Sequence, residues 1–313
     1  MRSCAHAEIV SMFFMDKKPE DHFDPSSTGF KDLVRYALEM AFNDFNFRTL
    51  TKTEAFTEAF KKEYSAWEES VKVIRKQRKK QDTEKLPPEP RMTEYLITRL
   101  DDGGFLERFV DYFKETCRDQ TQFDDWHNET CELFLKILDG TGEFQRYTKV
   151  YTGLAYGKAQ KIVNMMFKHL YCLNGADAWE NYFEHCHLVL DNFTLEWFKR
   201  NLKQKRIESW SNLVYRKPSV DHNDYLFYQE KIRKHFLPKD SQTHTYAGLT
   251  PFQAEFYIWP EIQWRMAAEG LLNQKLLSNV MRSGSKIASE TDIVDNCEKL
   301  IEQLVALKAS YSS

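Results

Sequence analysis

Apolar residues recur at intervals of three and four along most of the chain, a spacing that predicts amphipathic helices. The pattern is most regular in residues 154–173. There the apolar side chains fall within one arc of a helix, and Lys161, Asn164 and Lys168 fall on the opposite side. This pattern predicts a helix that packs through one face and exposes a basic, amide-bearing strip on the other. Strand-like alternation is not found at useful length, and no internal repeat is visible.

The same periodicity predicts a series of further helices. The longest, residues 53–82, opens at the capping-box sequence Thr51-Lys-Thr-Glu54 and ends before Leu86-Pro-Pro-Glu-Pro90. We expect residues 77–91 to form an exposed, extended connection. The other predicted helices cover residues 30–47, 92–100, 104–117, 122–138, 178–186, 191–205, 223–236, 250–277 with an interruption at Pro260, and about 290–307.

Together these elements predict an all-α fold of about ten to twelve helices. The turn cluster Asp24–Gly29 predicts the end of an irregular tail, residues 1–29. The Pro-rich connection near residue 90 predicts a boundary between a smaller N-terminal helical part, residues 30–90, and a main helical domain, residues 91–313.

Composition agrees with this prediction. The 313 residues include only 11 Gly and 9 Pro, so the frequent turns of a sheet-rich fold are largely missing. No segment approaches the ~20 apolar residues of a membrane span, and Glu8 interrupts the short apolar stretch at the start. The six cysteines are scattered without a C-x-x-C pair, which favours reduced thiols. We therefore expect a cytoplasmic protein without a membrane partner.

The net charge of −3 hides an asymmetry. Residues 199–239 carry eleven basic and four acidic side chains, a balance of +7, so the rest of the chain sums to −10. Basic side chains interleaved with aromatic ones suit nucleic acid or another polyanion, whereas solvated helix faces are the alternative explanation. The residues expected to contact nucleic acid are Lys168, Lys199, Arg200, Lys203, Arg206 and Arg233.

A helix-borne lysine followed by an aspartate offers one catalytic possibility. Lys158 and Lys161 lie near the start of the helix at 154–173, and Asp191 opens a later helix. This order resembles the helix-hairpin-helix DNA glycosylase/lyases, although their hairpin glycines are absent apart from Gly157. The resemblance implies that Lys158 or Lys161 attacks the sugar C1′ to give a Schiff base, with Asp191 as its carboxylate partner. Exposed lysines and an aspartate that caps a helix are the structural alternative.

Motifs between Phe123 and Trp259 carry a second resemblance. They include Phe123-Asp-Asp-Trp-His127, Tyr156-Gly-Lys-Ala-Gln-Lys161, Asn164-Met-Met-Phe-Lys168 and Leu190-Asp191. These motifs resemble a family of uncharacterised helical bacterial proteins, which implies a helical fold and a bacterial origin but no activity. If these positions line one pocket, its polar and aromatic members beside Lys161 and Asp191 are Trp126, His127, Gln160, Asn164 and Tyr228.

Two other chemistries have weaker patterns. Cys172, His185, Cys186 and His187, with His127 and Cys131, are suitable zinc ligand types, but their spacing matches no zinc module. We therefore expect buried thiols and neither a metal nor a cofactor. Arg216 and His222 fit the spacing of HEPN-type ribonucleases, but Pro218 between them favours a loop.

The sequence thus predicts a helical protein that engages nucleic acid, with a Lys/Asp lyase-type site as one possibility, and it leaves open whether the protein is an enzyme. One alternative is a non-catalytic protein-interaction module, in which the long helix at 53–82 and the acidic remainder bind another protein. The other alternative is a HEPN-like ribonuclease.

Overall fold

A computed structural model describes residues 22–43, 54–77, 92–139, 156–202, 209–215, 224–236 and 249–282, with four single positions between 302 and 309. This part of the chain is all-α, as predicted. It contains ten α-helices, two short 3₁₀-helices and no strand, and a single parallel β-bridge joins His22 and Asn174. None of its helices combines the length and the apolar character that a membrane crossing requires.

Most of the predicted helices are present, with ends shifted by a few residues. They are α2 (Phe30–Asn43), α3 (Glu54–Gln77), α4 (Met92–Asp102), α5 (Phe105–Lys114), α6 (Gln120–Asp139), α7 (Tyr156–Tyr171), η2 (Ala176–Trp179), α8 (Glu180–Phe183), α9 (Asn192–Asn201), η3 (Trp210–Asn212), α10 (Tyr225–Phe236) and α11 (Pro251–Arg282). The predicted connection after Gln77 and most of the predicted helix at 290–307 lie outside the described residues.

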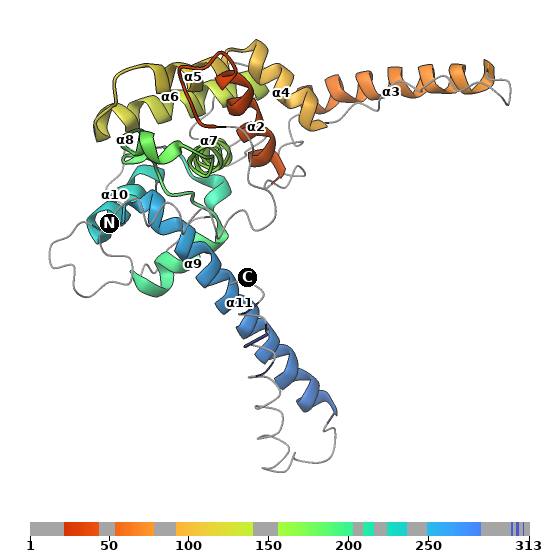
Figure 1. Cartoon of the computed structure of the whole chain (residues 1–313). Coiled ribbons are helices and arrows are strands. Elements are labelled where there is room, and N and C mark those ends of the chain that lie inside the picture. Colours follow the sequence, from red (N-terminus) through yellow and green to blue (C-terminus); the bar gives the residue numbers. More distant parts are fainter. Residues whose placement is uncertain are drawn as a thin grey trace.

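Helix α7 is the centre of the fold. It runs through the body in Figure 1, with α2, α4, α5 and α6 above it and α9, α10 and α11 below. Its strongest contacts are with α2 and α6. Every residue of α7 is buried except Lys161, which is partly exposed. A helix that is buried on all sides needs partners for its polar side chains as well as for its apolar ones.

The predicted boundary at residue 90 does not separate α2 from the main domain. Helix α2 packs along α7 and also contacts α5. Phe23, in the predicted tail, is fully buried, and its ring lies 5.2 Å from the rings of both Phe30 and Phe113. These residues belong to the main core because burying their apolar side chains there stabilises the fold more than a separate small unit could.

Two long helices extend beyond this body. In Figure 1, α3 projects to one side and the distal part of α11 projects downward. The predicted interruption of α11 at Pro260 is wrong, because the helix continues through that residue. A proline costs one backbone hydrogen bond and bends a helix, and the burial of Phe252, Phe256 and Ile262 on both sides of it offsets that loss.

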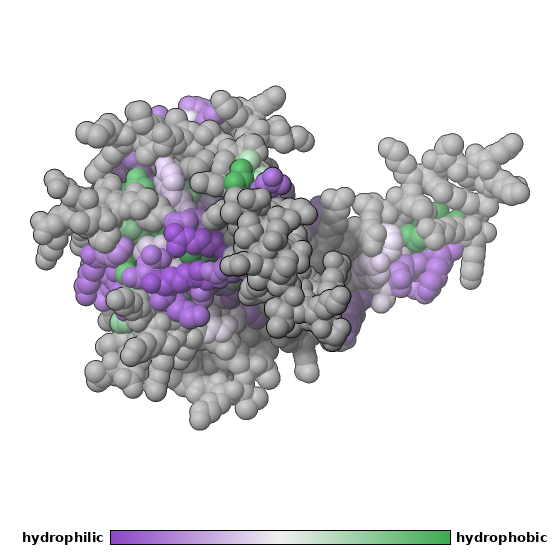
Figure 2. All heavy atoms as spheres, turned by 90° about the horizontal axis from the view of Figure 1, so that it is seen from below, coloured by the Kyte–Doolittle hydropathy of each residue, from purple (hydrophilic) through white to green (hydrophobic). Residues whose placement is uncertain are grey.

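The described surface of the body is mainly hydrophilic when it is seen from below, with hydrophobic residues in small separate spots (Figure 2). On the projecting helix α3, at the right of Figure 2, hydrophobic and hydrophilic residues occupy different sides. Helix α3 is therefore amphipathic although it lies beyond the core.

Candidate functional site

The lysine and aspartate that the sequence singled out lie close together. The Nζ of Lys161 is 3.5 Å from Oδ2 of Asp191, and it lies over the ring of Trp210. The two side chains are only 16% and 7% exposed. The pair is thus formed, but it lies mostly inside the protein.

Both carboxylate oxygens of Asp191 accept hydrogen bonds that stabilise the local structure. As the N-cap of α9, its Oδ1 accepts hydrogen bonds from the backbone N–H groups of Phe193 and Thr194, at 2.9 and 3.0 Å. Thr194 completes the capping box by accepting from the Asp191 N–H. The indole Nε1 of Trp259 donates to Oδ2 at 3.1 Å. This is the helix-capping alternative that the sequence left open.

Lys158 differs from its predicted place on an exposed helix face. It is only 8% exposed. The preceding residue, Gly157, explains this burial. The backbone of η3 approaches it so closely that a Cβ on Gly157 would come within 1.7 Å of the backbone oxygen of Trp210. The close approach of η3 covers this end of α7, and the Gly157 N–H donates to the Leu213 carbonyl at 3.1 Å.

A short non-helical segment, residues 187–190, crosses the interior between α8 and α9. We call it the buried connector, since all four of its residues are at most 1% exposed. Its backbone is bonded by side chains. Gln160 accepts from the N–H of Leu190 and donates to its carbonyl, at 3.2 and 2.7 Å. Gln229 does the same for Leu188, at 3.2 and 2.7 Å. The two side-chain amides thus supply the backbone hydrogen bonds that a neighbouring strand would otherwise provide to the connector.

The predicted exposed strip on α7 is wrong, because the connector covers it. Of the predicted strip, Asn164 and Lys168 are at most 2% exposed, and only Lys161 keeps some exposure. The Nζ of Lys168 donates to Glu255 at 2.6 Å, and the other oxygen of Glu255 accepts from the Val189 N–H at 2.9 Å. Burial raises the pKa of Glu255, and the charge and hydrogen bond of Lys168 oppose this. Lys168 therefore cannot contact nucleic acid as predicted, since its charge is buried and paired.

Asn164 is the centre of a buried hydrogen-bonded network. Its Oδ1 lies 2.8 Å from Nε2 of His127, and its Nδ2 donates to the Tyr225 hydroxyl at 2.9 Å. That hydroxyl lies 2.8 Å from Nδ1 of His187, whose Nε2 lies 2.7 Å from Asp124. The network extends across the core from α6 through α7 to the connector and α10.

Burial controls the protonation of this network. It lowers the pKa of His187 to about 4, against the opposing hydrogen bond to Asp124. Burial also lowers the pKa of His127, and the neighbouring His187 lowers it further. Burial acts to raise the pKa of Asp124, but His187 and Arg233 together hold it well below its usual range. Both imidazoles are therefore neutral at neutral pH, and Asp124 is ionised.

The residues predicted to share one pocket do not line a common hollow in the described part of the chain. His127, Gln160 and Asn164 converge, but all three are 0% exposed in a packed interior. Tyr228 is also fully buried, and its ring lies 5.2 Å from that of Phe198. Trp126 faces a surface hollow instead. The sequence reasoning missed Tyr225, which stands one helical turn before Tyr228 and bonds to the network in its place.

Three basic side chains among residues 199–239, those of Lys199, Arg200 and Arg233, are paired with carboxylates. Arg200 makes a two-pronged contact with Glu269, at 2.6 and 2.9 Å, and also bonds Glu196. Lys199 lies 3.4 Å from Glu196, with its side chain 64% exposed. Arg233 bonds both oxygens of Asp124, at 2.9 and 2.6 Å. Lys203 and Arg206 lie outside the described residues, as do Arg216 and His222 of the ribonuclease pattern.

No cluster of metal-ligating side chains is present in the described part of the chain. Cys131, Cys172 and Cys186 are buried free thiols, and burial raises the pKa of Cys172 to about 12. Buried thiols that stay protonated are poor nucleophiles and poor metal ligands.

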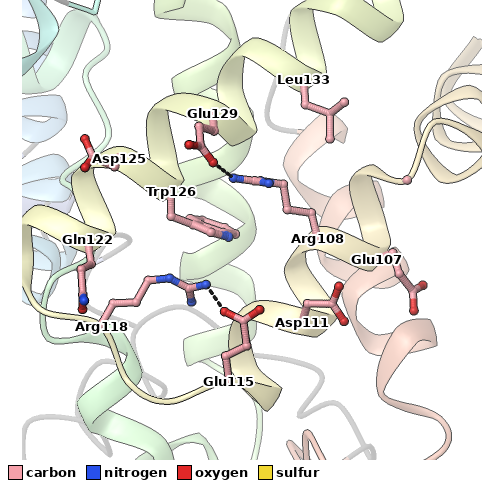
Figure 3. A pocket seen from close by; sticks show the side chains of 11 residues that line it. Glu107, Arg108, Asp111, Glu115, Arg118, Gln122, Asp125, Trp126, Glu129 and Leu133 are labelled. Carbon is pink, nitrogen blue, oxygen red and sulfur yellow. Dashed lines mark hydrogen bonds and ion pairs between the residues drawn. The ribbon is translucent and has the colours of Figure 1, made fainter.

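A surface hollow of about 530 Å³ lies between α5 and α6 (Figure 3). Trp126 lies in it between two arginines, with the guanidinium carbons of Arg108 and Arg118 at 5.7 and 5.9 Å from its ring centre. Each arginine also pairs with a carboxylate, Arg108 with Glu129 and Arg118 with Glu115. Sequence periodicity indicated only Trp126, since the arginines come from the neighbouring helix and the following turn.

No family model matches the chain, and neither a curated protein nor a solved structure is significantly similar to it. The resemblances to uncharacterised bacterial proteins and to DNA glycosylase/lyases therefore stay predictions.

Proposed function

We propose that this protein is a non-catalytic protein-interaction module. The observation that carries the proposal is the projecting helix α3. It is 24 residues long and contacts the body at α6, and much of it extends beyond the core (Figure 1). In proteins most helical stability comes from packing of an amphipathic face, so contact with a partner would stabilise α3.

The surface of α3 has the character of a docking helix. Tyr64, Trp67, Val71 and Ile74 recur at three and four on one side; Val71 is buried, whereas Tyr64, Trp67 and Ile74 keep part of their surface exposed. The opposite side is charged, as expected of an amphipathic helix that binds through one face.

Charge pairing favours this proposal over nucleic-acid binding. A phosphate contact needs basic side chains that are free to replace counterions. Arg200 and Arg233 instead hold carboxylates in two-pronged pairs, and Lys168 is buried against Glu255. Of the eleven basic residues among residues 199–239, Lys199, Arg200 and Arg233 are therefore already paired within the protein.

Site-specific photo-crosslinking in native cell extract tests the proposal. A photo-reactive residue replaces Glu68 on α3 or, as the matched control, Lys234 on α10, and both positions are exposed. We expect a protein adduct of defined size from position 68 and none from position 234. The same adducts from both positions, or none from position 68, would contradict the proposal.

Nucleic-acid binding is tested separately by fluorescence anisotropy with labelled single-stranded DNA and RNA. We expect no binding even at low salt. Binding whose affinity falls linearly with the logarithm of salt concentration would instead support the polyanion prediction.

A second candidate function, the Lys/Asp lyase, is favoured by one observation, the 3.5 Å approach of Lys161 to Asp191. In that chemistry the lysine amine forms a C–N bond to the sugar C1′, and water leaves as the Schiff base forms. Borohydride trapping on DNA with an abasic site tests it. A covalent adduct that disappears in Lys161→Ala supports the lyase, and no adduct removes it.

A further inference from the structure

The hollow between α5 and α6 carries a surplus of negative charge. Its lining includes five carboxylates and two guanidinium groups, a net charge of −3. Glu115 and Glu129 pair with the two arginines, and Glu107 lies 3.4 Å from Lys31. The lining residues are Gly104, Glu107, Arg108, Asp111, Glu115, Arg118, Gln122, Asp125, Trp126, Glu129 and Leu133.

Two exposed carboxylates of the lining remain available. Asp111 on α5 and Asp125 on α6 make no ion pair with any other described residue. They lie on the two helices that form the opposite walls of the hollow (Figure 3). A ligand with positive charges could therefore bind both walls at once.

The hollow also contains a hydrogen-bond donor without an acceptor. Nη1 of Arg118 is buried and has no hydrogen-bond partner, although the same guanidinium pairs with Glu115 and lies over Tyr112. A buried guanidinium N–H without an acceptor costs free energy. Arg118 lines the hollow, where a carbonyl oxygen of a ligand would be a suitable acceptor for this guanidinium. A peptide backbone supplies such carbonyls.

We propose that this hollow binds a linear, lysine- or arginine-rich segment of a partner protein. The inference rests on the proposed function and names its partner class. Two basic side chains of the segment pair with Asp111 and Asp125, and a main-chain carbonyl accepts from Arg118. The volume of about 530 Å³ is within the range of ligand sites and accommodates a few side chains. Nucleic acid is disfavoured because its phosphates would meet the surplus carboxylates.

A second acidic hollow serves as the matched control. It has a volume of about 320 Å³ and is lined by Asp177, Glu180 and Glu184, but by no tryptophan and no arginine. If basic peptides bind through charge alone, the two hollows would contribute alike. If the proposal holds, the hollow with Trp126 and the arginines would dominate.

The test measures fluorescence anisotropy of labelled hexa-arginine, with hexa-glutamate as the negative probe, on the full chain. We expect Asp111→Asn with Asp125→Asn to weaken hexa-arginine binding about tenfold, because two ion pairs are lost. Asp177→Asn with Glu184→Gln should change it less than about twofold. All four positions are exposed, so the variants should fold.

Equal weakening by both double variants, no hexa-arginine binding by the parent chain, or tighter binding of a labelled RNA would overturn the inference. The crosslinking from position 68 is an independent measurement. If its adduct persists while hexa-arginine fails to bind, only this inference fails, whereas loss of that adduct alone removes the proposed function of α3.

Discussion

Gln160→Met removes one amide from the interior and keeps the length of the side chain. In the parent chain this amide bonds both backbone groups of Leu190, accepts from Asn164 at 3.0 Å and donates to the Gly157 carbonyl at 2.8 Å. The methionine fills the same space but offers no comparable donor or acceptor. The variant therefore tests whether the buried connector depends on side-chain hydrogen bonds or on packing.

The expected cost follows from the groups left without partners. The N–H and the carbonyl of Leu190 would both stay buried, since Leu190 is 0% exposed. Each unsatisfied buried group costs about 1–3 kcal/mol, so together they should lower the free energy of unfolding by about 4 kcal/mol. For a chain of this size that corresponds to a fall in melting temperature of roughly 10 °C.

Urea unfolding followed by circular dichroism measures this difference. Gln263→Met on α11 is the matched control, because Gln263 is partly exposed and its side chain makes no hydrogen bond with another described residue. It should change the free energy of unfolding by less than about 0.5 kcal/mol. If the two variants change the free energy of unfolding by amounts that differ by less than about 1 kcal/mol, packing rather than side-chain hydrogen bonding holds the connector.

Three further predictions concern other parts of the interior. Gly157→Ala should destabilise by about 3 kcal/mol because its Cβ would collide with the backbone of η3, whereas Gly270→Ala, whose Cβ meets nothing, should stabilise by about 1 kcal/mol; similar effects in thermal unfolding would refute this. The pKa of His187 is about 4 in the folded protein and ~6.5 in the unfolded chain, so only the unfolded chain takes up this proton between these values and stability falls as pH drops from 6.5 to 4. His187→Gln should reduce that slope in urea titrations at several pH values, and an unchanged slope would argue against the assignment. Lys168→Met should cost about 3–5 kcal/mol because Glu255 is left as a buried, unpaired charge, and adding Glu255→Gln should recover a good part of it; a single variant as stable as the parent would count against this pairing.

The sequence predicted the helices well, because their apolar spacing is regular. The error at Pro260 has a local cause, since the rule that proline ends a helix ignores the apolar residues that bury both flanks. The place of α2 in the main core was not predictable from its own residues. Its apolar face needs a partner, but the spacing does not identify that partner as α7, more than a hundred residues away.

The candidate site was predictable only in part. Lys161 and Asp191 were expected as partners and lie together, yet the capping role of Asp191 was the alternative reading. The polar strip of α7 was assigned to solvent because polar faces usually are exposed. A signal was present in the chain, since residues 187–190 are too apolar for a surface loop and too short for a helix, and a buried backbone needs partners. Gln160 and Gln229 supply them.

The buried connector also bears on how the protein behaves at high concentration. An extended segment with unpaired backbone groups is a template onto which another molecule can add a strand, and such edges promote aggregation. Here the amides of Gln160 and Gln229 and the carboxylate of Glu255 already bond the backbone of Leu188, Val189 and Leu190. A neighbouring strand would expose a further row of backbone groups on its other side, whereas these side chains do not. The hydrogen bonding therefore does not extend to another strand. The protein thus contains a non-helical segment that is buried and whose Leu188 and Leu190 backbone groups are already paired, so they are not offered to a second copy.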